Sequence, residues 1–218
     1  MSNYTDDDIE IIYWGEDEAD DIVDSNRFKK KRKRKEKFDL RQELLGFAKM
    51  LAIAVVIAFC INNIVIINAT VPTGSMEKTI HKKSRMIGNR LAYTFETPKR
   101  GDIIIFKYPD DEKQNFVKRV IALPGEKVRV ENGVVYVITT KGQEIRLEEE
   151  YTYFEGGRID KAGDFAEVEV PSNCYFVLGD NRNNSMDSRY WKTTNFVRED
   201  KIIGKAVFCY YPSFNILN

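Results

Sequence analysis

Met50 to Ala69 reads MLAIAVVIAFCINNIVIINA, twenty residues without a single charge. At about 1.5 Å per residue, a helix of this length reaches roughly 30 Å, the thickness of a bilayer's hydrocarbon core. The asparagine amides within the run are costly in lipid. We predict a transmembrane helix over residues 44–69. The alternatives are a buried core helix and a cleaved signal peptide, which would be N-terminal and shorter.

The charges that precede this segment form two blocks. Residues 1–26 hold ten acidic residues and no basic one, whereas residues 27–37 hold nine basic residues and one acid. Blocks of like charge repel themselves and have little apolar surface to bury, so we expect residues 1–37 to be a disordered tail. Basic residues mark the cytoplasmic end of a membrane helix. We therefore expect the tail in the cytoplasm, with the lipid bilayer rather than nucleic acid as its partner.

The part of the chain after residue 70 is typical of β-structure. Short β-branched or aromatic runs bounded by turn residues predict strands at 102–108, 116–123, 166–171, 174–180 and 201–211. Asn132-Gly133 suits a type I′ turn and predicts a hairpin over 127–137. We therefore expect a mainly β protein, in which one antiparallel β-sheet domain over residues 70–218 lies outside the cytoplasm on one N-terminal transmembrane helix.

The cysteines and the one histidine do not indicate a metal. Cys60, Cys174 and Cys209 have no Cys-x-x-Cys spacing, and a single histidine cannot complete a usual zinc site. We expect neither a metal nor a cofactor. Cys174 and Cys209 lie in apolar, strand-like runs, where buried thiols are the ordinary interpretation. A disulfide between them stays open for a domain outside the cytoplasm.

A candidate nucleophile lies shortly after the apolar segment. In VPTGSMEKTI, Ser75 follows a glycine that permits an unusual backbone angle. The one histidine, His81, stands among lysines and is typical of a solvated surface residue, which disfavours a Ser-His-Asp triad. Ser75 and Lys78 match the Ser-x-x-Lys spacing of penicillin-binding enzymes, but the Lys-Thr-Gly partner motif is absent.

A second lysine lies on a predicted strand. In FVKRVIAL, alternation places Lys118 on one face and Arg119 on the other, each between apolar neighbours, so the pattern leaves open which cation is buried. A lysine loses its proton when it is desolvated, whereas an arginine stays charged. A base working near neutral pH needs a pKa about 2–3 units below the ordinary lysine value. The plain alternative is a strand lysine whose amine reaches solvent.

Four blocks in this order resemble the type I signal peptidases of bacteria. They are VPTGSM, RGDIIIF (100–106), FVKRVIALPGE (116–126) and the polar loop GDNRNNSMDSR (179–189). The resemblance covers roughly residues 50–211, and the tail lies outside it. The family usually has proline where this chain has Lys78.

This resemblance implies roles for particular residues. Ser75 would be the nucleophile and Lys118 the general base, with an acyl-enzyme as the intermediate. The Ser75 N–H and the Thr73 hydroxyl would stabilise the oxyanion. Supporting residues would be Ser185, which orients Lys118; Asp187 and Arg189, which hold the loop; and Gly179, which leaves room at the cleft.

The resemblance also implies a substrate and a location. Exported preproteins would bind as an added strand and be cleaved after an Ala-x-Ala-like end of the signal peptide, by an enzyme anchored in the bacterial cell membrane. Three alternatives are a penicillin-binding type acyltransferase, an inactive membrane-anchored module that binds signal peptides, and a soluble self-cleaving repressor with a similar Ser-Lys pair.

Overall fold

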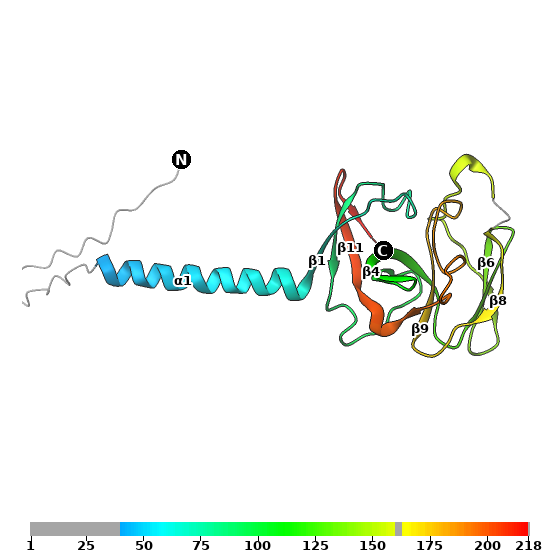
Figure 1. Cartoon of the computed structure of the whole chain (residues 1–218), viewed down its shortest axis with the longest axis horizontal. Helices are drawn as coiled ribbons and strands as arrows, with labels where there is room; N and C mark the ends of the chain where they lie inside the picture. Colours follow the sequence, from blue (N-terminus) through cyan, green and yellow to red (C-terminus); the bar gives the residue numbers. More distant parts are fainter. Residues whose placement is uncertain (1–39, 160–162, 218) are drawn as a thin grey trace, which may run out of the picture. The chain divides into compact units, whose positions relative to one another are not determined.

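The computed structural model describes residues 40–159 and 163–217 (Figure 1). The apolar run forms a helix, α1 (Leu40–Cys60), which continues as a short π-helix, η1 (Ile61–Val65). No residue of α1 is buried, and Leu40–Val65 is long and apolar enough to cross a membrane. The tail predicted over residues 1–37 lies outside the described residues.

The helical segment differs in its limits from the one that hydropathy predicts. It begins at Leu40 and ends at Val65, and the last residues of the apolar run form a strand, β1 (Ile66–Thr70). Ile66 and Ile67 are apolar and β-branched, so they suit either a lipid-facing helix or a strand. Pairing with the next strand decides between the two, because it buries Ile67 in the core.

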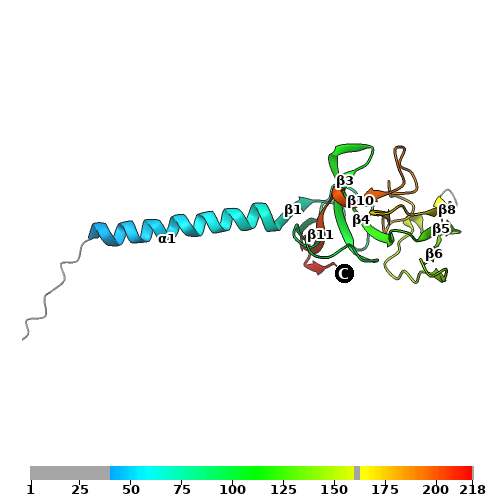
Figure 2. The ribbon, with the colours of Figure 1, turned by 90° about the horizontal axis from the view of Figure 1, so that it is seen from below.

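The strands lie in two antiparallel sheets (Figures 1 and 2). Along the larger sheet the order is β1, β2 (Arg85–Asn89), β11 (Ile202–Tyr211), β3 (Ile103–Tyr108), β4 (Asp111–Ala122), β9 (Cys174–Leu178) and β10 (Val197–Arg198), with β12 (Asn215–Ile216) paired to β11. The smaller sheet has the order β7 (Glu144–Arg146), β6 (Val134–Ile138), β5 (Lys127–Glu131) and β8 (Phe165–Glu169). Short 3-10 helices lie at η2 (Glu155–Gly157) and η4 (Glu199–Lys201).

The mainly β, antiparallel class is confirmed, but the strands form two sheets rather than the single sheet expected. The chain leaves the larger sheet at Ala122 and turns at Gly125, whose φ of 79° suits glycine. A separate apolar cluster then fills the space between the smaller sheet and the end of β4 and β9, and includes Ile121, Val128 and Phe176. The number of predicted strands does not show whether they form one sheet or two sheets with separate cores.

The larger sheet is buried on both faces at its centre. In β3, Ile103 and Ile105 pack into one apolar cluster, whereas Ile104 and Phe106 pack into another on the opposite face. Successive side chains of a strand point to opposite faces, so a strand buried on both sides reads as a continuous apolar run. The second half of the neighbouring strand β4 packs into these cores, and the two cations Lys118 and Arg119 lie on this buried part.

The three cysteines are free. Cys60 is exposed on α1, Cys209 is buried in the cluster under β1, β2 and β3, and Cys174 packs against the cluster beneath the smaller sheet. The disulfide left open between Cys174 and Cys209 is therefore not formed.

The turn predicted at Asn132-Gly133 joins β5 to β6, and both residues have the positive φ of a type I′ turn, 50° and 75°. A Cβ on Gly133 would lie 2.7 Å from Ile159 Cγ2 and 3.1 Å from Phe154 Cζ. We expect Gly133→Ala to lower the free energy of unfolding by roughly 1–3 kcal/mol.

Gly142→Ala is the matched control, because Gly142 also has positive φ, 78°, but has open space around it. Urea unfolding of the full chain in detergent, followed by tryptophan fluorescence, compares the two variants. Equal destabilisation would show that the contacts with Phe154 and Ile159 contribute nothing.

Candidate active site

Ser75 and Lys118 meet in the folded chain. The Lys118 Nζ atom donates a hydrogen bond to Ser75 Oγ at 2.7 Å and another to the Val117 carbonyl at 3.1 Å. Both residues are buried. Lys118 comes from the middle of β4, and Ser75 from the turn that joins β1 to β2. Two residues far apart in sequence thus present a hydroxyl and an amine to each other.

The environment of Lys118 favours its neutral form. Burial lowers the pKa of the Lys118 amine to about 8, while the charges of Asp187 and Asp180 act in the opposite direction. Burial has the larger effect because each of these carboxylates is already paired with an arginine. With this pKa, about a tenth of the molecules carry a neutral amine at pH 7, far more than with an ordinary lysine, and a general base must be in this form.

The neighbouring cation on β4, Arg119, is paired with a carboxylate. Arg119 is also buried, but Asp180 accepts hydrogen bonds from its Nε at 3.0 Å and from its Nη2 at 2.8 Å. The Cζ atom of the guanidinium lies 3.8 Å from the centre of the Tyr151 ring. Both cations that the alternating pattern left open are therefore buried. Arg119 has a carboxylate partner, whereas the Lys118 amine, among the described residues, has hydrogen bonds to a hydroxyl and a carbonyl and lies over the Phe116 ring.

The segment around Ser75 is held by the loop that follows β9. The Asn181 N–H donates to the Ser75 carbonyl at 3.0 Å, and the Asn181 amide donates to the Gly74 carbonyl at 3.1 Å. Thr79 donates to Asp180, and Met76 is fully buried. Gly74 is not among the residues with positive φ, so the segment does not use the unusual backbone angle that glycine permits there.

Thr73 and the Ser75 backbone provide two hydrogen-bond donors beside the Ser75 hydroxyl. Thr73 Oγ1 lies 3.4 Å from Ser75 Oγ. Within the described part of the chain, the Ser75 N–H has no hydrogen-bond partner. Both donors are thus available beside the hydroxyl.

The polar loop 179–189 is held by a buried ion pair. Asp187 accepts hydrogen bonds from Arg189 Nε at 2.8 Å, from Arg189 Nη2 at 2.9 Å and from the Gly179 N–H at 3.1 Å. A Cβ on Gly179 would lie 2.2 Å from Ser185 Oγ and 2.5 Å from the Ser75 carbonyl oxygen. Gly179 therefore stands at a close approach between the loop and the segment around Ser75.

Three other side chains that the sequence analysis considered form no hydrogen bond with Ser75 or Lys118 among the described residues. Ser185 Oγ is buried but has no partner among the described residues, so the hydrogen bond expected from it to Lys118 is not formed. His81 is exposed and pairs with Glu77 at 2.7 Å. The Lys78 amine lies 5.0 Å from the centre of the Tyr153 ring, with no contact to Ser75 among the described residues.

Ser75 and Lys118 open into a groove of about 930 Å³. One wall is β1 and the segment after it, and the other is the first half of β4 with parts of β3. β1 is an edge strand, and β4 pairs with β9 only from Arg119 to Ala122. The lining residues are Asn62, Ile66–Thr73, Ser75, Arg90, Ile105, Lys107, Gln114–Lys118, Asn184, Met186 and Ile203. The groove therefore lies between two unpaired strand edges and has three cations and no carboxylate in its lining.

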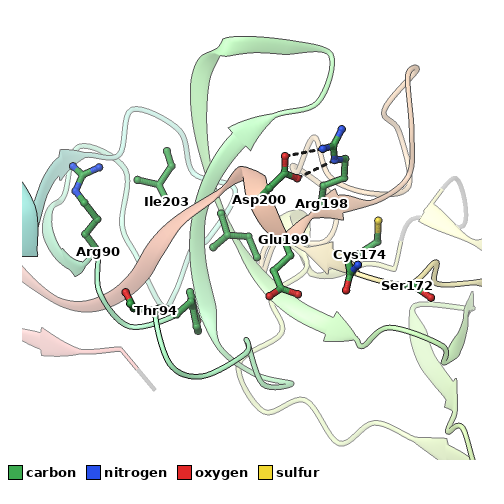
Figure 3. Close-up of a pocket in the computed structure, with 11 residues that line it drawn as sticks. Arg90, Thr94, Ser172, Cys174, Arg198, Glu199, Asp200 and Ile203 are labelled. Carbon is green, nitrogen blue, oxygen red and sulfur yellow. Dashed lines mark hydrogen bonds and ion pairs between the residues drawn. The ribbon is translucent and has the colours of Figure 1, made fainter.

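A second cavity, of about 820 Å³, lies beside η4 and contains neither Ser75 nor Lys118 (Figure 3). Its charged groups include Arg198 and Asp200, which are joined by two hydrogen bonds of 2.9 and 2.7 Å. Arg90 and Ile203 line both cavities. The second cavity therefore lacks the serine and lysine pair that lines the first.

Residues 44–211 match the family described as signal peptidase, peptidase S26. A probable signal peptidase I-2 of Synechocystis is 37% identical over 173 residues, covering 77% of this chain and 73% of that protein. A signal peptidase I of Bacillus amyloliquefaciens is 34% identical over 178 residues, 82% of this chain and 94% of that protein. A crystal structure of a signal peptidase I from Enterococcus faecalis shares 32% identity, covering 50% of this chain and 97% of that one, with a TM-score of 0.41.

The family match and these relatives define a serine peptidase. Within that class, the chain belongs to the signal peptidase family, peptidase S26, and its relatives are type I signal peptidases. The membership predicted from the four sequence blocks is confirmed.

Sequence reasoning missed the residues that hold the site together. Asp180 and Asn181 lie in a block that was singled out, but no role was given to either one. The signal was present in strand alternation, because a buried Arg119 requires a carboxylate partner. Asp180 reaches Arg119 because of the register between β4 and β9, and this pairing of distant strands cannot be predicted from a local sequence pattern.

Gly179→Ala tests the close approach between the loop and the nucleophile. Its Cβ would meet the Ser75 carbonyl at 2.5 Å, so we expect it to displace Ser75 and reduce kcat at least a hundredfold. In Gly74→Ala the Cβ meets only the flexible Glu77 side chain, at 3.2 Å, and most activity should remain. Peptidase assays on both variants, with circular dichroism to check folding, make the comparison. Equal activity would contradict the packing argument.

Proposed function

We propose that this chain is a membrane-bound endopeptidase that removes N-terminal signal peptides from exported preproteins, with Ser75 as nucleophile and Lys118 as general base. The observation that carries this proposal is the 2.7 Å contact between Ser75 Oγ and a buried lysine amine that has no carboxylate partner among the residues the structure describes. The relatives, which are named signal peptidase I, support the substrate class.

The proposed reaction proceeds through an acyl-enzyme. The neutral Lys118 amine takes the proton of Ser75 Oγ as that oxygen attacks the scissile carbonyl. The Ser75 N–H and the Thr73 hydroxyl stabilise the oxyanion, and the loss of one such donor typically costs about 3–4 kcal/mol. Lys118 then gives the proton to the leaving amine, and the mature protein departs. A water molecule, deprotonated by Lys118, releases the signal peptide from Ser75.

The loop 179–189 positions Lys118 and Ser75 without taking part in the reaction. Asp187 and Arg189 fix the course of the loop, and Gly179 keeps the loop close to the nucleophile segment. Ser185 Oγ is buried and without a partner among the described residues. Its oxygen can accept a hydrogen bond from an N–H of the neutral Lys118 amine, which leaves the lone pair of that amine to take the proton of Ser75.

The groove suits an extended peptide. Unpaired strand edges on both of its walls offer backbone groups to a strand laid between them. We propose that the end of the signal peptide binds in this way, with small side chains of an Ala-x-Ala-like sequence nearest to Ser75. The lining near Ser75 is mainly apolar or neutral, as such a substrate requires.

The chain would be anchored in the bacterial cell membrane by Leu40–Val65. The nine basic residues of 27–37 would keep the N-terminal tail in the cytoplasm, and the β-rich peptidase domain over 70–218 would lie on the other side. The lipid bilayer is then a permanent partner, and the groove opens on the side to which preproteins are exported.

Substitution of single residues tests the proposed pair. We expect Ser75→Ala and Lys118→Ala each to abolish cleavage of a preprotein by the purified full chain in detergent, since each removes a reacting group. Lys78→Ala should keep most of the activity, because Lys78 lies over Tyr153. Loss of activity in Lys78→Ala together with survival in Lys118→Ala would favour the acyltransferase arrangement. If the wild-type chain yields no shortened product, the binding module is favoured.

The pH dependence tests the state of Lys118. Because the base must be neutral and its pKa is about 8, kcat/KM should rise about tenfold per pH unit below pH 8 and level off above it. Asp187 raises this pKa, so Asp187→Asn should move the midpoint to lower pH. Rates from pH 6 to 10 give the midpoint. A midpoint above pH 10, the range of an ordinary lysine, would contradict the buried base.

A further inference from the structure

Two cations in the groove lining have no ionic partner. Arg90 is exposed and Lys107 is half-buried, and neither side chain has a hydrogen bond or an ion pair with any described residue. Figure 3 shows Arg90 beside Ile203, apart from the paired Arg198 and Asp200. By contrast, Lys205 on the strand between them pairs with Asp102. Arg90 and Lys107 therefore remain available to an external anion.

The register of the larger sheet places these two cations at the same end of the groove. Lys205 of β11 pairs with Asn89 of β2 on one side and with Ile104 of β3 on the other. Arg90 follows Asn89, and Lys107 lies further along β3 in the same direction. Two strand intervals and about two residues along the strands separate them, roughly 12 Å in all, a gap that two long side chains can close around one anionic group.

This end of the groove is the one next to the apolar helix. The Arg90 N–H donates a hydrogen bond to the carbonyl of Val65, the last residue of the segment long enough to cross a membrane. If Leu40–Val65 spans the bilayer, Arg90 lies at the depth of the lipid headgroups. The loop after Arg90 also exposes apolar side chains, with Leu91 42% and Phe95 95% exposed. Exposed apolar groups beside a cation are typical of a surface that meets the bilayer interface.

We propose that Arg90 and Lys107 bind the phosphate of an anionic phospholipid at the membrane-proximal mouth of the groove, with Leu91 and Phe95 in the interface beside it. This inference rests on the proposed membrane-bound function. A lipid held there would fix the height of the groove above the bilayer. The depth of Arg90 and the exposure of Phe95 favour a lipid over an acidic side chain of the preprotein, since a peptide in the groove gives Phe95 no partner.

The test compares cleavage in two bilayers. The full chain is placed in nanodiscs of phosphatidylcholine alone or of phosphatidylcholine mixed with phosphatidylglycerol, and kcat/KM for a preprotein is measured in each. The readout is the ratio of the two rates, which cancels any direct effect of a variant on the groove. A cation near an anionic surface is worth about 1 kcal/mol, roughly a fivefold preference. The double variant Arg90→Gln/Lys107→Gln should therefore lose most of the stimulation by phosphatidylglycerol.

The matched control is Lys141→Gln/Lys192→Gln, which removes the same charge from exposed positions outside the groove and should keep the stimulation. The basic tail is identical in every variant, so its own effect on the ratio is constant. Native mass spectrometry in neutral detergent supplies a second readout that is independent of activity. Wild type should retain phosphatidylglycerol at lower lipid concentrations than Arg90→Gln/Lys107→Gln.

Each outcome has a distinct meaning. An equal loss of stimulation in both double variants, or equal lipid retention, would overturn the lipid site while leaving the peptidase function intact. If the stimulation persists in Arg90→Gln/Lys107→Gln and only preproteins with an acidic residue before the cleavage site are cleaved more slowly, the two cations bind substrate and the lipid site is wrong. Absence of cleavage in every bilayer would instead reject the proposed function.

Discussion

The arrangement of the site depends on one constraint, a lysine amine buried without a carboxylate to neutralise it. Lys118 and Arg119 are adjacent on one strand and both are buried, yet only Arg119 forms an ion pair. An arginine keeps its charge in any environment and therefore needs Asp180, whereas a lysine can give up its proton. The fold thus uses the same burial for two purposes: it locks Arg119 into the structure and lowers the pKa of Lys118.

The ionic interactions around Lys118 act mainly to hold positions. The pair of Arg119 with Asp180 joins β4 to the loop after β9, and the pair of Asp187 with Arg189 shapes that loop from within. A buried pair of this kind contributes little net stability compared with apolar packing, but breaking it leaves an isolated charge. Each of these carboxylates is already neutralised by its own arginine, so neither raises the pKa of Lys118 to an ordinary value.

The sequence predicts the parts of this protein that rest on local patterns. The type I′ turn at Asn132-Gly133, the main strands and the apolar helix follow from short-range chemistry. The division into two sheets, the strand nature of Ile66 and Ile67, and the partner of Arg119 do not, because each is decided by contacts between distant segments. The nucleophile and the base were proposed from a resemblance. Their 2.7 Å contact required β4 and the turn after β1 to be brought together by the fold.

The strand β1 is at once the continuation of the apolar helix and one wall of the groove. No linker separates the anchor from the surface that would hold the peptide, so the groove has a fixed reach. A long flexible tether would let a peptidase sample many heights and cleave any accessible sequence. If the chain acts as proposed, a groove whose lining includes Asn62 and Ile66 would instead select a bond by its distance from the membrane. Position along the peptide would thereby become part of recognition, alongside the identity of its side chains.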